Sequence, residues 1–289
     1  MDAVATGMAR RRVAALIAAC SLEMSPRDAL ANDSLRSLLP AGATIFVNHP
    51  PSVTHHDIVA ACARLHRAGF VPVPHVAARR LISFTQASDF LQRAATEARA
   101  DRILLIGGDD PPAGPFRASL DLLATGAVER AGIREVAFAG YPEGHPAIDS
   151  AALDAALRAK VALAQQARLA VSLVTQFGFE AQPILRWIPA QRAAGLDCPV
   201  HVGIAGPATV ATLAKFAIRC GIGASLRALA RGHTAFARIM TETGPDGLIG
   251  DLVAGETSDA PIAGLHVFTF GGVRRTAAWM RSSFGHRAL

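Results

Sequence analysis

Short apolar runs rich in valine, isoleucine and leucine alternate with longer amphipathic, alanine-rich stretches along nearly the whole chain. Short apolar runs between turn signals are typical of buried strands, and the longer stretches have the length and spacing of helices. Strands that alternate with helices form a parallel sheet, because each connection returns the chain to the same end of the sheet. The alternation therefore predicts an α/β fold built from βα units.

Eight of the apolar runs are predicted to be strands. They are residues 14–22, 44–47, 70–74, 102–106, 135–139, 170–175, 199–203 and 264–269. The clearest helices between them are residues 56–67, 87–98, 150–166, 184–194 and 209–220. Gly69 and Gly195 follow two of these helices, as helix stops do.

Eight βα units close into a barrel that leaves no strand edge exposed. We therefore predict a single (β/α)8 TIM barrel, a catalytic domain that covers residues 1–289. Residues 1–12 are expected to be disordered. The interval 221–263 is longer than one connection needs, so it is expected to add a helical segment between strands 7 and 8.

The chain carries a net charge of +6, with 29 lysines and arginines against 23 aspartates and glutamates. A basic protein favours anionic partners, and dinucleotides and glutamylated folates both qualify. Its arginines are scattered apart from short runs at 10–12, 79–80 and 274–275, without an aromatic-interleaved strip, so no nucleic-acid partner is expected. No stretch has the length of a membrane span, so no membrane partner is expected either, while a homo-oligomer stays open.

The four cysteines, Cys20, Cys62, Cys198 and Cys220, show no Cys-x-x-Cys spacing. Neither a zinc site nor a disulfide framework is indicated, so each is expected to be a small core residue of a cytoplasmic protein. His55 and His56 are adjacent, which is the wrong spacing for two metal ligands on one helix face. They are expected to open a solvated helix, and no metal is predicted.

The N-terminus resembles a short secretion signal, because three arginines at 10–12 precede an apolar run at 13–20. That run is short, and the acidic Glu23 follows almost at once. The count of eight strands also requires this segment as the first strand. We therefore assign it to the barrel.

Polar residues follow the predicted strands, where the active sites of such barrels lie. They are Glu23, Asn48 and His49, His75, Asp109, the segment from Tyr141 to His145, and Gln176, after strands one to six respectively. Carboxylates, histidines, the only tyrosine and an amide would thus converge on one rim. This convergence predicts an active site.

Each of these residues also has a purely local interpretation. Glu23 is suited to cap a helix, and Asp109, after two glycines, to form an Asx turn. His75 is suited to pack at a strand end. Tyr141 is also explained by turn chemistry, and His145 by helix capping.

Five segments resemble the methylenetetrahydrofolate reductases. Residues 21–26 (Ser-Leu-Glu-Met-Ser-Pro) resemble the Ser-Phe-Glu-Phe-Phe-Pro segment that opens that family, and residues 107–111 (Gly-Gly-Asp-Asp-Pro) its Arg-Gly-Asp-x-Pro turn. Residues 140–146 (Gly-Tyr-Pro-Glu-Gly-His-Pro) match its Tyr-Pro-Glu-x-His-Pro motif, the most specific of the set. Residues 174–177 match Ile-Thr-Gln-Phe, and residues 199–204 resemble an apolar Pro-Gly-Ile strand. The segments occur in the family's order over nearly the whole chain.

The resemblance implies an oxidoreductase that carries hydride from NADH or NADPH to FAD, then to 5,10-methylenetetrahydrofolate, giving 5-methyltetrahydrofolate. It implies Glu23, Asp109 and Gln176 as the catalytic set. Glu23 would be the acid that opens the five-membered ring of the folate, which requires a carboxyl group protonated near neutral pH in a desolvated pocket. Asp109 and Gln176 would bind the pterin, and the charge of Asp109 would favour the cationic intermediate.

The same resemblance implies a cofactor-binding set for FAD. Its members are Asn48, His75, Gly108, Tyr141, His145, Asp154 and Lys160. The chain also departs from the family pattern, since Gly107 replaces an arginine, Asn48 a threonine, and Ala156 and Ala159 polar residues of the helix that grips FAD.

These departures keep a second route open, in which hydride passes directly from the nicotinamide to the folate. Two other functions also stay open. One is a catalytically silent folate- or flavin-binding barrel that acts as a partner subunit, and the other is a folate-dependent methyltransferase. The partners expected for the reductase are a folate substrate and a nicotinamide dinucleotide.

Overall fold

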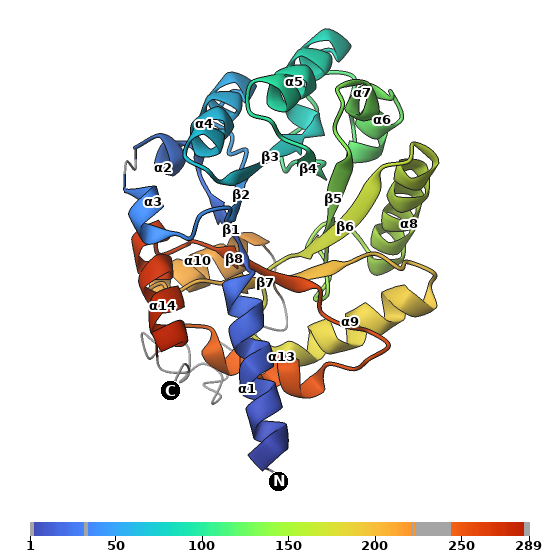
Figure 1. The fold of residues 1–289 in the computed structure, drawn as a ribbon. Coiled ribbons are helices and arrows are strands. Elements are labelled where there is room, and N and C mark those ends of the chain that lie inside the picture. The colour runs from blue at the N-terminus through green and yellow to red at the C-terminus, as the bar shows by residue number, and fades with distance from the viewer. Residues whose placement is uncertain (1–2, 32–33, 221, 223–243, 286–289) are drawn as a thin grey trace. The chain divides into compact units, whose positions relative to one another are not determined.

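The computed structural model describes residues 3–31, 34–220, 222 and 244–285. Its eight strands form a closed barrel in sequence order, from β1 to β8 (Figure 1). The strands are β1 (Ser21–Met24), β2 (Thr44–Val47), β3 (Val71–Ala77), β4 (Arg102–Ile106), β5 (Glu135–Gly140), β6 (Ala170–Thr175), β7 (Val200–Ala205) and β8 (Gly264–Phe268). The predicted (β/α)8 barrel is confirmed.

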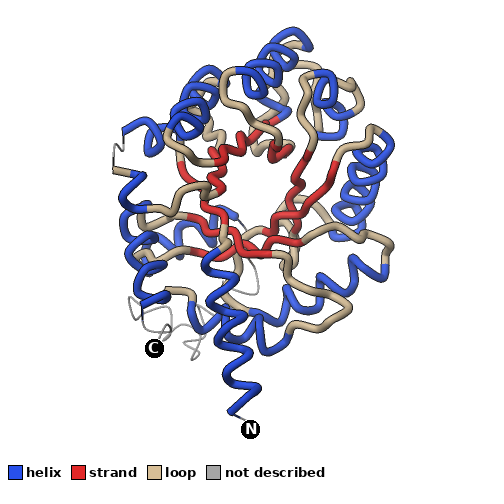
Figure 2. Tube along the Cα trace, in the orientation of Figure 1, coloured by secondary structure: helices blue, strands red, loops and turns tan. Residues whose placement is uncertain are grey.

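Helices alternate with the strands along the chain (Figure 2). They are α1 (Ala3–Ala18), α2 (Pro26–Ala31), α3 (Leu35–Leu38), α4 (His55–Arg67), the 3-10 helix η1 (Ala78–Arg80), α5 (Phe84–Thr96), α6 (Ser119–Leu123), α7 (Ala127–Arg130), α8 (Ser150–Gln166), α9 (Ala181–Ala193), α10 (Val210–Cys220), α13 (Asp246–Gly255) and α14 (Val273–Gly285). Helix α10 is the helix predicted over residues 209–220, and α13 lies in the interval 221–263, where the extra helical segment was predicted. Residues 221 and 223–243 of that interval lie outside the described residues.

The chain divides into two compact units. The β1–β6 unit comprises Leu22–Gly140 and Asp154–Val174. The β7–β8 unit comprises Met1–Ser21, Tyr141–Leu153 and Thr175–Leu289. The single catalytic domain over residues 1–289 stays a prediction.

In the β1–β6 unit, one apolar residue from each of five strands forms a core cluster. Its members are Phe46, Val73, Leu104, Ala137 and Val174, with Ile106 packed against them. The strands are parallel, and the register pairs Phe46 with Val73 and Leu104 with Ala137. Because paired residues in neighbouring strands point to the same face, the cluster marks the inner face of these strands.

Helix α4 covers the outer face of β2 and β3 and packs against α5. Ile58, Cys62 and Leu65 are fully buried on one side of it, at the spacing of a helix face. A capping box fixes its first turn, because Thr54 accepts a hydrogen bond from the Asp57 amide and the Asp57 carboxylate accepts from the Thr54 amide. The helix ends before Gly69, whose φ of 82° confirms the predicted stop.

The prediction of a first strand over residues 14–22 was wrong. Residues 3–18 form α1, and β1 begins only at Ser21. The buried residues of this segment are Val13, Leu16, Ile17 and Cys20. They follow one another after three, one and three positions, which fits the period of a helix and not that of a strand. Residues 3–12, which were expected to be disordered, are helical as well.

In the β7–β8 unit, α1 packs against α13, α14 and β8. Arg12 forms a bidentate ion pair with Glu256 at 2.6 and 3.0 Å and donates to the carbonyl oxygen of Ile262 at 2.6 Å. These contacts make the segment around Arg12 a packed part of this unit. Among the described residues, no helix combines the length and apolar composition needed to cross a membrane.

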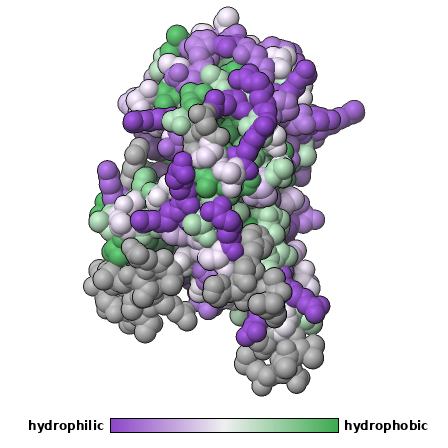
Figure 3. Space-filling view, turned by 60° about the vertical axis from the view of Figure 1, so that its left-hand side comes forward, coloured by the Kyte–Doolittle hydropathy of each residue, from purple (hydrophilic) through white to green (hydrophobic). Residues whose placement is uncertain are grey.

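Three of the cysteines, Cys20, Cys62 and Cys198, are buried thiols, as expected of core residues, and Cys220 is partly buried. Burial raises the pKa of Cys20 to about 12, so its thiol is protonated and inert at neutral pH. On the face shown in Figure 3, hydrophilic side chains are spread among hydrophobic ones and form no single strip.

Candidate functional site

Glu23 lies within β1, as its third residue, and not after the strand as predicted. The register pairs it with Phe46 of β2, so its side chain belongs to the inner face. The Nδ2 atom of Asn48 donates to its Oε1 atom at 3.2 Å, and the Nε2 atom of His75 lies 3.5 Å from its Oε2 atom. Both carboxylate oxygens are thus contacted, one by a side chain at the end of β2 and the other by a side chain of β3.

Asn48 and His75 reach Glu23 because of where β2 and β3 place them. Asn48 follows the last residue of β2, two positions after Phe46, and therefore shares its face. His75 lies inside β3, which extends to Ala77 and not only to residue 74 as predicted. Its ring packs edge-on against Phe46, with centroids 6.0 Å apart. Only 14% of the Glu23 side chain and 7% of the His75 side chain are exposed.

The inner face carries a second polar layer two residues before the apolar cluster. Arg102 pairs with Glu135 at 2.6 Å, and Ser172 donates to the other Glu135 oxygen at 2.8 Å. These residues lie toward the amino ends of β4, β5 and β6, whereas Glu23 and His75 lie toward the carboxyl ends of β1 and β3. Glu23 and His75 are in register with Phe46 and Leu104, two members of the apolar cluster.

The loops after β3 and β4 are joined by arginines. Arg80 of η1 forms an ion pair with Asp110 at 2.5 Å, and Nη1 of Arg79 donates to the carbonyl oxygen of Gly108 at 3.2 Å. Gly108 has a φ of 94°, a region that favours glycine, so this tight turn depends on its missing side chain. Asp109 follows in the turn and is exposed.

His49, which the sequence predicted with Asn48 after the second strand, is buried, and its ring lies edge-on to Phe90 of α5 with centroids 6.2 Å apart. Burial, together with the positive charge of Arg80 and the neighbouring His75 and His55, lowers its pKa to about 4. The imidazole is therefore neutral at physiological pH. Within the described part of the chain, its Nδ1 atom, Oδ1 of Asn48 and Nη1 of Arg80 are buried without a hydrogen-bond partner.

The remaining predicted rim residues belong to the β7–β8 unit. Tyr141 and His145 pack edge to face, with ring centroids 5.3 Å apart and planes at 90°. The Nε2 atom of Gln176 donates to the carbonyl oxygen of Cys220 at 3.1 Å. That Tyr141, His145 and Gln176 share a site with Glu23 stays a prediction.

Asp154 and Lys160 lie on α8, within the β1–β6 unit. The Nζ atom of Lys160 lies 5.2 Å from the ring centroid of Phe138, which neighbours the inward-facing Ala137 and so points to the outer face of β5. Burial lowers the pKa of Lys160 to about 8. The cation is therefore packed between helix and strand, a placement that gives no support to its predicted role in binding FAD.

The structure thus brings together Glu23, Asn48 and His75 from the predicted set and places His49 near His75 and Arg80. From the sequence, Arg79 and Arg80 were noted only as one of the short arginine runs. No local pattern predicts the pair that Arg80 forms, because its partner Asp110 lies 30 positions further along the chain.

No family model matches this chain. Among solved structures, an uncharacterised protein from Clostridium thermocellum that binds two copies of 5-methyl-5,6,7,8-tetrahydrofolic acid is similar, with a TM-score of 0.58 and 10% sequence identity. The similarity covers 93% of this chain and 95% of that protein.

The Yersinia pestis DHPS, solved with a pterine–sulfa conjugate, is similar over 94% of this chain and 96% of its own, with a TM-score of 0.50 and 14% identity. A dihydropteroate synthase from Thermus thermophilus has a TM-score of 0.47, with 16% identity and 93% of each chain covered. At such low identities, the matches to the Clostridium thermocellum and Yersinia pestis proteins are likenesses of fold.

Proposed function

We propose that this protein is a folate-dependent oxidoreductase of the methylenetetrahydrofolate reductase kind, which interconverts 5,10-methylenetetrahydrofolate and 5-methyltetrahydrofolate with NADH or NADPH. The observation that carries the proposal is the shielded Glu23 carboxyl group on the inner face of the strands, held by Asn48 and His75 beside Phe46 of the apolar cluster. A general acid needs such a fixed and largely desolvated position.

An unsatisfied polar atom beside Glu23 supports a ligand site. A buried polar atom without a partner costs about 1–3 kcal/mol, so proteins rarely leave one. Here Oδ1 of Asn48, the residue that donates to Glu23, is a buried acceptor without a donor. A polar heterocycle with donors along one edge, as a pterin has, would satisfy it. Two proteins of similar fold support this ligand class, one solved with methyltetrahydrofolate and one with a pterine conjugate.

In the proposed reaction, Glu23 gives its proton to the folate nitrogen that leaves the methylene carbon, and the five-membered ring opens to an iminium cation. Hydride from the nicotinamide then adds to that carbon, giving the methyl group and the oxidised nicotinamide. Asn48 and His75 orient the Glu23 carboxyl group throughout. The negative charge that remains on Glu23 stabilises the neighbouring cation.

FAD supplies an intermediate hydride carrier in the family that the sequence resembles. The residues of the β1–β6 unit do not fit a flavin well. Lys160 lies against Phe138, Asn48 is engaged with Glu23, and Gly107 brings no cation. We therefore propose direct transfer of hydride from the nicotinamide and derive no step through a flavin.

The test begins with the visible absorbance spectrum of the purified protein, before and after incubation with FAD and gel filtration. Oxidation of NADH and of NADPH is then measured with 5,10-methylenetetrahydrofolate, and 5-methyltetrahydrofolate is identified by mass spectrometry. A colourless protein that forms this product supports direct transfer. A bound flavin together with activity supports the two-step route. Absence of product, with or without FAD, would overturn the reductase proposal.

A second candidate, folate-dependent methyl transfer, is favoured by one observation. The similar Clostridium thermocellum protein binds a methylated folate, which is also the methyl donor such an enzyme would use. Loss of the methyl group from 5-methyltetrahydrofolate without any change in the nicotinamide would favour this candidate. Tight folate binding without either reaction would favour the silent partner subunit.

A further inference from the structure

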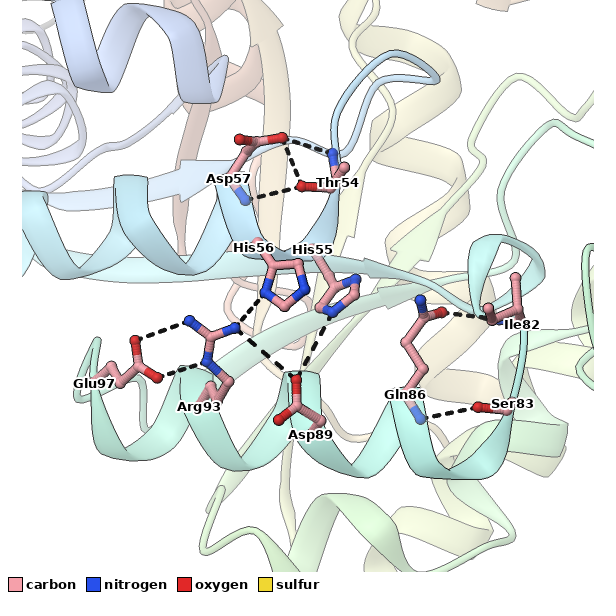
Figure 4. Close-up of polar contacts among 10 residues, drawn as sticks. All are labelled: Thr54, His55, His56, Asp57, Ile82, Ser83, Gln86, Asp89, Arg93 and Glu97. Atoms are coloured by element: carbon pink, nitrogen blue, oxygen red, sulfur yellow. Dashed lines mark hydrogen bonds and ion pairs between the residues drawn. The ribbon is translucent and has the colours of Figure 1, made fainter.

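Two histidines and an aspartate meet between the first turn of α4 and α5, outside the group formed by Glu23, Asn48 and His75 (Figure 4). His55 and His56 are the first two residues of α4, and Asp89 lies on α5. Their nearest ligand atoms all lie within 4.8 Å of one another. The Nε2 atom of His55 and the Oδ2 atom of Asp89 are 3.8 Å apart.

The backbone that carries these side chains is fixed at both helix starts. The capping box of Thr54 and Asp57 holds the first turn of α4. Ser83 accepts a hydrogen bond from the amide of Gln86 and holds the first turn of α5 in the same way. The ring of His55 also packs against Phe90, with centroids 5.7 Å apart. With the backbone fixed, rotation of the His55, His56 and Asp89 side chains is enough to change the spacing of their ligand atoms.

Figure 4 shows one cationic side chain, Arg93, beside the two histidines and Asp89. Its positive charge would oppose a bound metal ion. Its guanidinium contacts His56 and lies 4.0 Å from Asp89. Glu97 already holds it through two hydrogen bonds, at 2.6 and 3.2 Å. The charge of Arg93 is therefore compensated by a carboxylate outside the three ligands, and Glu97 can keep the guanidinium when His56 turns toward a metal ion.

We propose that His55, His56 and Asp89 bind a divalent transition-metal ion of the zinc class, which links α4 to α5, with water in the remaining coordination position. Two imidazoles and one carboxylate are ligands that suit Zn²⁺, Co²⁺ and Ni²⁺. Zinc holds such ligand atoms at about 2.0–2.2 Å, so they lie roughly 3–3.5 Å apart when bound. Closing the observed spacing to this value requires shifts of about 1 Å, which the exposed side chains of His56 and Asp89 can make around His55, whose side chain is 11% exposed.

This site was not foreseen from the sequence, because two adjacent histidines cannot chelate a metal from one helix face in the way an i, i+4 pair does. In the folded protein, Asp89 of another helix, 34 positions after His55, supplies a third ligand atom beside the two histidines. The proposal does not depend on the folate chemistry.

The full-length protein, freed of metals with a chelator, is titrated with Co²⁺ in an absorbance experiment and with Zn²⁺ by calorimetry. We expect one equivalent to bind with micromolar affinity and Co²⁺ to give the visible bands of a tetrahedral site. His55→Ala and Asp89→Asn should each weaken the affinity at least tenfold. Arg93→Gln should strengthen it, because the opposing cation is removed.

His66→Ala is the matched control, since His66 is an exposed histidine at the other end of α4. Its affinity should equal that of the unaltered protein, and circular dichroism checks that every variant is folded. Failure of Co²⁺ and Zn²⁺ to bind at millimolar concentration would overturn the proposal. Equal affinity in the unaltered protein and in a folded His55→Ala, Asp89→Asn double variant would also overturn it.

Discussion

The side-chain amide of Asn48 donates a hydrogen bond to Oε1 of Glu23 at 3.2 Å, across the paired strands β1 and β2. The bond fixes one oxygen of the carboxyl group while the other faces His75. It gives Asn48 a role in orienting the proposed acid, whereas the sequence resemblance had assigned it to cofactor binding.

Replacement of Asn48 by leucine should lower kcat/KM for the folate reaction by about ten- to a hundredfold. A hydrogen bond to a charged acceptor contributes about 1.5–3 kcal/mol, which corresponds to this range of rates. Asn48→Thr retains a donor and should keep more activity than Asn48→Leu. Steady-state kinetics of the two variants measures these changes. Values of kcat/KM equal to that of the unaltered protein in both variants would count against the orienting role.

The buried His49 should make the free energy of unfolding depend on pH. Burial lowers its pKa from 6.5 to about 4 in the folded protein. As the pH falls below 6.5 the unfolded chain takes up a proton that the folded protein does not, so stability is lost between pH 6.5 and about 4. Between pH 7 and pH 4.5 the unaltered protein should lose about 2 kcal/mol more than His49→Asn.

Urea unfolding at the two pH values measures this difference. The contributions of other titrating groups to the free energy of unfolding are the same in both proteins and cancel. His66→Asn, at an exposed histidine of α4, is the control and should leave the pH dependence unchanged. Parallel pH profiles for the unaltered protein and His49→Asn would show that the His49 side chain is hydrated in the folded state.

Gly108→Ala should destabilise the protein by about 1 kcal/mol or more, because the φ of 94° is unfavourable for any residue with a Cβ atom. The new Cβ atom would also lie 3.4 Å from Cβ of Ala77. Gly107→Ala is the matched control, since its Cβ atom would meet nothing within 4 Å. Equal urea midpoints for the two variants would contradict the strained turn before Asp109.

Most of the barrel could be predicted from the sequence because local signals bound its strands. The bounds predicted for β2, β4 and β6 are those observed, since apolar runs there are flanked by polar residues, glycine or helix ends. The prediction of the first strand was wrong for a local reason too. An apolar, alanine-rich run was counted as a strand by its hydrophobicity, although its buried residues Val13, Leu16 and Ile17 follow a helical period.

The candidate site was predicted only where strand ends determine it. Glu23, Asn48 and His75 come together because neighbouring parallel strands end on the same side. The contacts of Arg80 and Lys160 depend on which way a long side chain turns after its backbone is placed. Periodicity carries no information about that choice, so the pairing of Arg80 with Asp110 was missed.

Turnover of the Glu23→Gln variant tests the account most directly, because glutamine keeps the shape of the side chain and cannot supply the proton. We expect kcat with 5,10-methylenetetrahydrofolate and the preferred nicotinamide to fall by about a hundredfold or more, while folate binding and the urea midpoint stay close to those of the unaltered protein. Glu129→Gln, at an exposed carboxylate of α7, should leave turnover unchanged. Undiminished turnover in a folded Glu23→Gln variant would contradict the proposed role of this carboxyl group.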